Sequence, residues 1–105
     1  MDEGSAMMFS AFEDGGEMWT GKGKRSVKKR VRFSETFRRP PSVKVHVAMW
    51  DMDQASNQRA DIQAVDITED GFAIEFKTWG DTRVARVRAD WMAIGEVTDE
   101  DDWIV

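Results

Sequence analysis

The chain has 105 residues, which is the length of one small domain. It contains no cysteine and one histidine, and this excludes a disulfide framework, zinc sites built on thiolates or on several histidines, and cysteine nucleophiles. The formal net charge of −5 argues against nucleic acid as a partner of the whole molecule, and 41% hydrophobic residues with only 2 prolines are typical of a soluble globular domain.

Residues 1–16 form an acidic N-terminal segment with a candidate first strand at Met7–Phe12. A signal peptide requires a basic start and an apolar stretch of about 7–15 residues, and a membrane-spanning helix requires about 20 apolar residues. The sequence therefore predicts neither. We expect a chain that stays in the cytoplasm or leaves the cell in a particle or by lysis.

Strand-like alternation begins at Val27 and coincides with a basic segment. Three apolar residues fall on one face and three basic residues on the other: Val27, Val31 and Phe33, and Lys28, Arg30 and Arg32. Segment 22–39 carries nine basic residues and one acid, hence +8, whereas the remainder has 6 basic and 19 acidic residues, hence −13. Such a segment binds phosphate groups or an acidic membrane surface, or its side chains pair with acidic segments of the same or a neighbouring subunit. We favour the second interpretation because the whole molecule is acidic.

Four further segments alternate apolar and polar residues and are separated by turns. They are Val43–Met49, Arg59–Ile67, Phe72–Lys77 and Ala85–Ala93. Pro40 and Pro41 precede the first of them, residues 51–58 read as a polar loop, and turns are expected at residues 69–71 and 79–82. Five or six short strands without a helix to cover a sheet predict an all-β fold of two antiparallel sheets packed face to face.

Four motifs occur in a specific order along this pattern. They are Val31-Arg32-Phe33 leading through Phe37 to Arg39-Pro40-Pro41, Trp50-Asp51-Met52-Asp53, Asn57-Gln58-Arg59, and Gly71-Phe72 followed by Thr78-Trp79 and Trp91-Met92-Ala93-Ile94-Gly95. In order and spacing the chain resembles the H-type lectin family, the small β-sandwich of snail agglutinins and of the C-terminal part of discoidins. The resemblance covers roughly residues 17–95.

The resemblance implies a six-stranded antiparallel β-sandwich over residues 17–96, followed by an acidic tail at 97–105. It also implies a parallel homotrimer, or a dimer of trimers, that binds glycans such as N-acetylgalactosamine in shallow sites between subunits. A trimer suits so small a chain, because association buries more apolar surface and three sites give avidity. No cofactor or metal is implied.

Two residues match the sugar site of the family. Arg59 matches the arginine that hydrogen-bonds sugar hydroxyls, for which guanidinium donors are suited. The alternative is that Arg59 pairs with Asp51, Asp53 or Asp81. Trp79 matches a tryptophan beside the site, where an indole packs on the apolar face of a sugar ring. The alternative for Trp79 is core or interface packing.

Other positions depart from the pattern of the family. The acid expected from the N-terminal loop is absent at residues 20–24, although Gly21 still offers backbone groups. Gly80 stands where several members have a histidine or an acid, and Asp81 beside it is a candidate substitute. Ala85 stands where the family has an aromatic residue. With Lys22, Lys24 and Arg83 nearby, we therefore keep an acidic or phosphorylated glycan as an alternative ligand.

Motifs of catalysis are missing from the sequence. There is no phosphate-binding loop and no nucleophile elbow, and His46 has no histidine partner. Asp51 and Asp53 alternate as calcium ligands do, but the later Gly and Glu of an EF-hand loop are absent, which favours a solvated turn.

We therefore predict a binding module and not an enzyme, with Arg59, Trp79, Gly21, Gly80 and Asp81 around the sugar. The alternative is a structural or adhesion trimer of a phage-like particle with a decayed sugar site. A third interpretation is polyanion binding through the basic segment 22–39.

Overall fold

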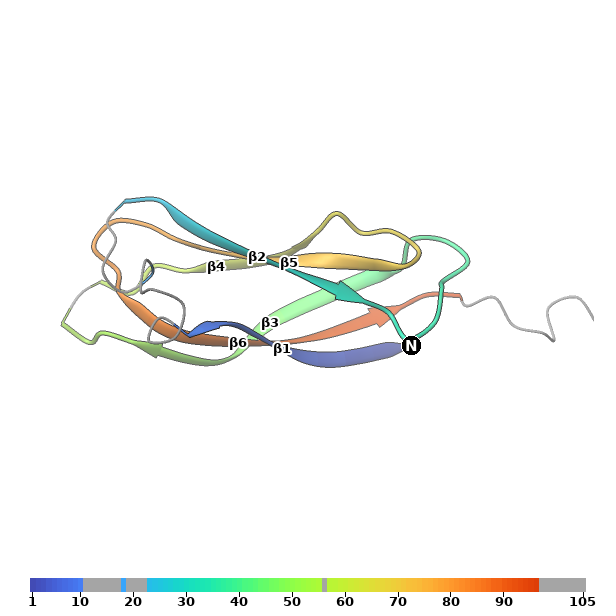
Figure 1. Ribbon diagram of the computed structural model, residues 1–105, viewed down its shortest axis with the longest axis horizontal. Helices are drawn as coiled ribbons and strands as arrows, with labels where there is room; N and C mark the ends of the chain where they lie inside the picture. Colours follow the sequence, from blue (N-terminus) through green and yellow to red (C-terminus); the bar gives the residue numbers. More distant parts are fainter. Residues whose placement is uncertain (11–17, 19–22, 56, 97–105) are drawn as a thin grey trace, which may run out of the picture.

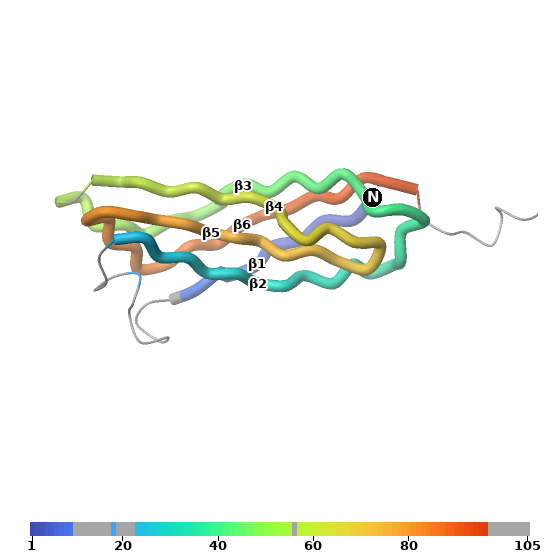
Figure 2. The backbone as a smooth tube through the Cα atoms, turned by 90° about the horizontal axis from the view of Figure 1, so that it is seen from above, coloured from blue at the N-terminus to red at the C-terminus, as the bar shows by residue number. Residues whose placement is uncertain are grey.

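The computed structural model describes residues 1–10, 18, 23–55 and 57–96. Six strands follow one another along the chain: β1 Asp2–Ser10, β2 Arg25–Arg32, β3 Ser42–Met52, β4 Asp61–Val65, β5 Gly71–Thr78 and β6 Val84–Ile94. They form two antiparallel three-stranded sheets, in the orders β1-β6-β3 and β2-β5-β4. The two sheets lie face to face (Figures 1 and 2). The all-β fold of six antiparallel strands in a sandwich is thereby confirmed.

The alternation of side chains explains the core between the sheets. Along β6, buried Val87, Ala89, Trp91 and Ala93 alternate with solvent-facing residues, because successive side chains of a strand point to opposite faces. The facing strand β5 contributes Phe72, Ile74 and Phe76, all of which are buried. These central strands therefore supply the apolar surface that holds the two sheets together.

Strand β1 completes the sheet of β6 and β3. It pairs with β6 from Asp2↔Ala93 to Ser10↔Arg86, with a register shift between Met7 and Phe9. Both Met8 and Phe9 are buried in the core. The candidate first strand thus exists, but it begins nearer the N-terminus than Met7. The predicted acidic tail at 97–105 lies outside the described residues.

Several predicted strand boundaries differ from the structure, and the ends of β3 and β4 show the reason most clearly. β3 continues to Met52, into the predicted loop, because Asp51 pairs in register with Arg86 of β6 and their side chains form an ion pair. β4 stops at Val65, before the predicted end at Ile67, because Asp66 takes a left-handed conformation with φ 54°. A strand cannot continue through such a residue.

Candidate functional site

The expected site residues meet at one end of the sandwich, on the left in Figure 1. Arg59 lies in the β3–β4 connection, just before β4. Trp79, Gly80 and Asp81 lie in the turn that joins β5 to β6. Gly21 lies outside the described residues, and the structure therefore brings four of the five expected residues to one place.

Arg59 forms an ion pair with Asp81, one of the three acids that the sequence left open as its partner. Arg59 Nη1 donates to Asp81 Oδ1 over 2.8 Å, and Asn57 Nδ2 reaches the same oxygen at 3.4 Å. The hydrogen bond from Arg59 lowers the pKa of Asp81, since it favours the charged carboxylate. The ion pair is therefore fully formed at and above neutral pH, and it is lost only as the pH falls through the lowered pKa of Asp81.

Two buried threonines fix the backbone beneath this pair. The Thr82 hydroxyl accepts a hydrogen bond from the Arg59 amide over 3.0 Å and donates to the carbonyl of Asn57. The Thr78 hydroxyl donates to the carbonyl of Arg59 over 2.6 Å. Neither threonine was predicted as part of the site, although Thr78 follows Phe72, Ile74 and Phe76 at the inward-facing positions of β5. The signal in the sequence is a threonine at a position where the alternation predicts an inward-facing apolar side chain.

Gly80 makes room for the guanidinium of Arg59. Its φ is 70°, in the left-handed region that favours glycine. A Cβ at this position would lie 3.0 Å from Arg59 Nη1. The role of Gly80 in this structure is thus to shape the turn and to accommodate Arg59.

Arg25 ties the start of β2 to the same turn. Although charged, Arg25 is only 6% exposed. It donates to three backbone carbonyls, those of Gly23 at 3.0 Å, Met18 at 3.0 Å and Gly80 at 3.2 Å. In the sequence Arg25 is one of nine cations of the basic segment 22–39, and nothing there distinguishes this internal role.

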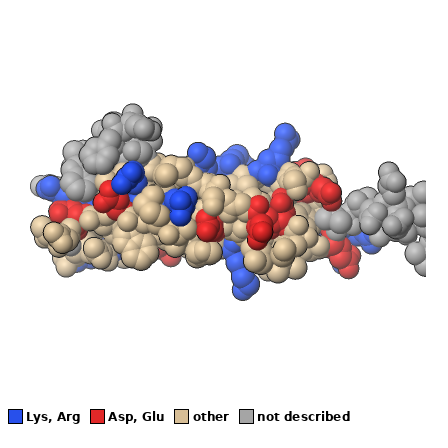
Figure 3. All heavy atoms as spheres, turned by 90° about the horizontal axis from the view of Figure 1, so that it is seen from below, with Lys and Arg blue, Asp and Glu red and all other residues tan. Residues whose placement is uncertain are grey.

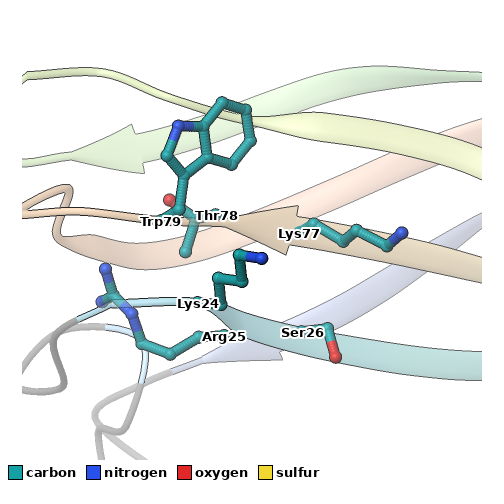
Figure 4. A pocket seen from close by; sticks show the side chains of 6 residues that line it. All are labelled: Lys24, Arg25, Ser26, Lys77, Thr78 and Trp79. Carbon is teal, nitrogen blue, oxygen red and sulfur yellow. The ribbon is translucent and has the colours of Figure 1, made fainter.

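Trp79 borders a shallow hollow of about 380 Å³ that Lys24, Arg25, Ser26, Lys77 and Thr78 also line. Its indole is 41% exposed and does not belong to the buried core. Figure 4 shows the ring pointing away from the Lys24 and Arg25 side chains. The exposed indole is therefore available to a ligand or to another subunit.

The remaining sequence candidates have local partners or are buried. Ala85 is buried and offers no surface to a ligand. Asp51 pairs with Arg86, and Asp53 Oδ1 accepts the Ala55 amide over 3.1 Å, as in an Asx turn. His46 lies on the outer face of the β1-β6-β3 sheet, 3.9 Å from Asp90. Among the described residues no three His, Asp or Glu side chains gather as a metal site. Nor does any described helix have the length and apolar character required to cross a membrane.

Comparison with known proteins places this geometry in context. The family model of the H-type lectin domain matches residues 28–94. A protein of Fuscovulum blasticum described as "ATP synthase subunits region ORF 7" is 58% identical over 101 residues, which are 96% of this chain and 88% of that protein. A discoidin-1 chain of Dictyostelium discoideum is 39% identical over 75 residues, or 70% of this chain and 30% of the discoidin chain.

The fold has a solved counterpart. Recombinant discoidin II of Dictyostelium discoideum superimposes with a TM-score of 0.78 at 23% sequence identity, over 93% of this chain and 37% of that chain. The likeness extends to nearly all of the present sandwich, while the chain spans well under half of either discoidin.

Proposed function

Since the chain belongs to the H-type lectin family, we propose that it is a carbohydrate-binding module without catalytic activity, and that the sugar lies against Arg59 and Trp79 beside Gly80 and Asp81. The observation that carries this proposal is the exposed Arg59–Asp81 pair at the β5–β6 turn, which also carries the exposed Trp79. A guanidinium donates hydrogen bonds and a carboxylate accepts them, so the pair offers both to vicinal sugar hydroxyls. The Trp79 ring supplies an apolar surface for the sugar ring.

The exposure of the pair supports this role. The side chain of Arg59 is 38% exposed and that of Asp81 is 60% exposed. Only one N–H of the five on a guanidinium is required for the bond from Nη1 to Asp81, which leaves other donors for a ligand. The buried Thr78 and Thr82 fix the Arg59 backbone before any ligand arrives, and such preorganisation reduces the entropy lost on binding.

We propose N-acetylgalactosamine or a related galacto-sugar as the first candidate ligand. The missing acid at residues 20–24 and the exposed Lys24 and Arg83 favour an acidic glycan as the second. The proposal includes Gly21, whose backbone would contact the sugar from the N-terminal loop.

We also propose that the sandwich assembles as a homotrimer with the sugar sites between subunits. Three exposed apolar side chains support assembly through the outer face of the β1-β6-β3 sheet: Met7, Met92 and Ile94. They lie on the face that is turned away from the core, where burial against another subunit would be favourable.

The test is a glycan array probed with the multivalent wild-type protein, followed by titration of the best ligand against variants. Arg59→Ala should weaken binding by about 10- to 100-fold, the range expected when hydrogen bonds to a charged group are lost. Arg39→Ala is the matched control, because Arg39 also forms an exposed ion pair, with Glu96 at 3.0 Å, but at the opposite end of the sandwich.

Wild-type protein that binds no glycan on the array would contradict the lectin proposal. It would favour the second candidate, a structural or adhesion trimer with a decayed site. The absence of the family's acid at 20–24 and of its aromatic residue at Ala85 supports that candidate.

A further inference from the structure

A row of three basic side chains lies on the outer face of the β2-β5-β4 sheet. Lys28, Arg30 and Arg32 alternate with inward-facing residues of β2, which is an edge strand of this sheet. We term them the β2 basic row. β2 lies along one long edge of the molecule (Figure 2), and Figure 3, which looks onto the other sheet, shows Lys and Arg side chains projecting from the long upper edge.

The structure separates this row from three other cations of segment 22–39. Arg25 is buried against backbone carbonyls, Lys29 donates to the Met7 carbonyl over 3.2 Å, and Arg39 pairs with Glu96. Within the row, Lys28 pairs with Asp66 at 3.1 Å. In the portion of the chain that the structure describes, Arg30 and Arg32 have no ion-pair partner. Their two charges are therefore not neutralised by the protein itself.

The spacing of the row suits an extended ligand. Every second residue of a strand faces the same side, so neighbouring charges of the row stand about 7 Å apart. Beside Arg30 and Arg32 lies a hollow of about 370 Å³ that reaches the turn of Thr68 to Gly71. Asp70 also lines it, but its Oδ1 accepts a hydrogen bond from the Thr36 hydroxyl over 3.0 Å. The hollow gives an anionic group room to approach both guanidinium groups.

The chemistry of the surrounding face distinguishes between polyanions. Outward-facing neighbours of the row on β5 and β4 are Ala73, Glu75, Lys77, Asp61, Gln63 and Val65. Glu75 is paired with Lys77 at 3.3 Å. None of these residues is aromatic, whereas proteins that bind single-stranded nucleic acid stack bases on aromatic side chains. A guanidinium group can donate two parallel hydrogen bonds to two oxygens of one sulfate or phosphate group.

We propose that the β2 basic row binds a linear sulfated polysaccharide, with sulfate groups on Arg30 and Arg32 and with Lys28 extending the row. This site is distinct from the proposed sugar site, because it lies on a sheet face and uses none of the residues of the β5–β6 turn. A protective role against edge-to-edge strand pairing is the competing explanation for cations on an edge strand.

Retention on immobilised heparin, a sulfated polysaccharide, tests the proposal. We compare the wild type with Arg30→Ser/Arg32→Ser and with Arg86→Ser/Arg88→Ser, which removes the same charge from the outer face of the other sheet. We expect the first variant to lose at least 10-fold in affinity and its salt dependence to become shallower, since fewer counterions are released. The second variant should lose less than about 3-fold.

Several results would overturn the proposal. These are no retention of the wild type at physiological salt, equal losses in the two double variants, or tighter binding of single-stranded DNA than of heparin. If Arg30→Ser/Arg32→Ser aggregates, Arg30→Lys/Arg32→Lys replaces it in the test. The lysines retain the positive charge and still protect the edge strand from pairing with another strand, but they cannot donate two parallel hydrogen bonds as guanidinium groups do. It should bind heparin several-fold more weakly, and unchanged affinity would contradict the proposed site. Arg59→Ala should leave heparin retention unchanged, so this test stands apart from the lectin test.

Discussion

At the scale of single residues, Gly80 links backbone conformation to the position of Arg59. Replacing Gly80 by Ala adds a Cβ at a φ of 70° and 3.0 Å from Arg59 Nη1. We expect the free energy of unfolding to fall by about 1–2 kcal/mol, because a left-handed backbone is costly for a residue with a Cβ. We also expect sugar binding to weaken about 10-fold or more as the guanidinium is displaced. Urea denaturation and ligand titration measure the two effects.

Gly23→Ala is the control for this prediction. Gly23 has a φ of 78°, but a Cβ there would meet no atom within 4 Å. It should therefore show a similar loss of stability and retain sugar binding. Equal binding by both variants would show that Arg59 does not depend on the space at Gly80.

At the scale of secondary structure elements, Arg25 joins β2 to the turn between β5 and β6. Arg25→Met retains much of the aliphatic stem but removes the hydrogen bonds to the carbonyls of Gly23, Met18 and Gly80, although the Gly80 carbonyl still accepts the Gly23 amide over 3.1 Å. We expect a loss of about 1–3 kcal/mol in the free energy of unfolding, because the buried Met18 carbonyl loses this donor. Chemical denaturation measures this loss, and Lys24→Met next to it, on an exposed residue, should change stability by less than about 0.5 kcal/mol.

The same elements show how far the sequence predicts the fold and the site. Strands β2, β3, β5 and β6 follow from alternation, because the pattern of burial on a sheet repeats every second residue. The end of β4 does not follow, since nothing in the pattern announces the left-handed Asp66. The pairing of Arg59 with Asp81 rather than with Asp51 depends on which strands are neighbours, and Arg25 looks in the sequence like any other exposed cation. Motif order identified the family, but these contacts require the three-dimensional arrangement.

At the scale of the whole molecule, the outer face of the β1-β6-β3 sheet is where we propose that subunits of the homotrimer meet. Met92→Lys replaces an exposed apolar side chain of this face by a charge, beside Glu3 and Lys44, and should dissociate the proposed trimer, because a charge is costly to bury at an interface. Light scattering after size exclusion should show the mass fall to one third. Gln63→Lys adds the same charge to the outer face of the other sheet and should leave the mass unchanged. A monomeric wild type would contradict both assembly and sites between subunits.

The turn that carries Trp79, Gly80 and Asp81 is also one of the connections that cross between the two sheets, and it joins central strand β5 to central strand β6. Each sheet must form around one of these strands, so the sheets cannot dock in native register unless this turn is closed. Arg59 and Asn57, whose backbones are bound to Thr78 and Thr82, can reach their positions only after β3 and β4 have joined different sheets. Completion of the candidate site thus depends on contacts between segments far apart in the chain, and we expect it to accompany docking of the sheets. We therefore expect partly folded molecules to lack the candidate site altogether. The sugar-binding capacity of a sample would then measure the fraction of its molecules that are native.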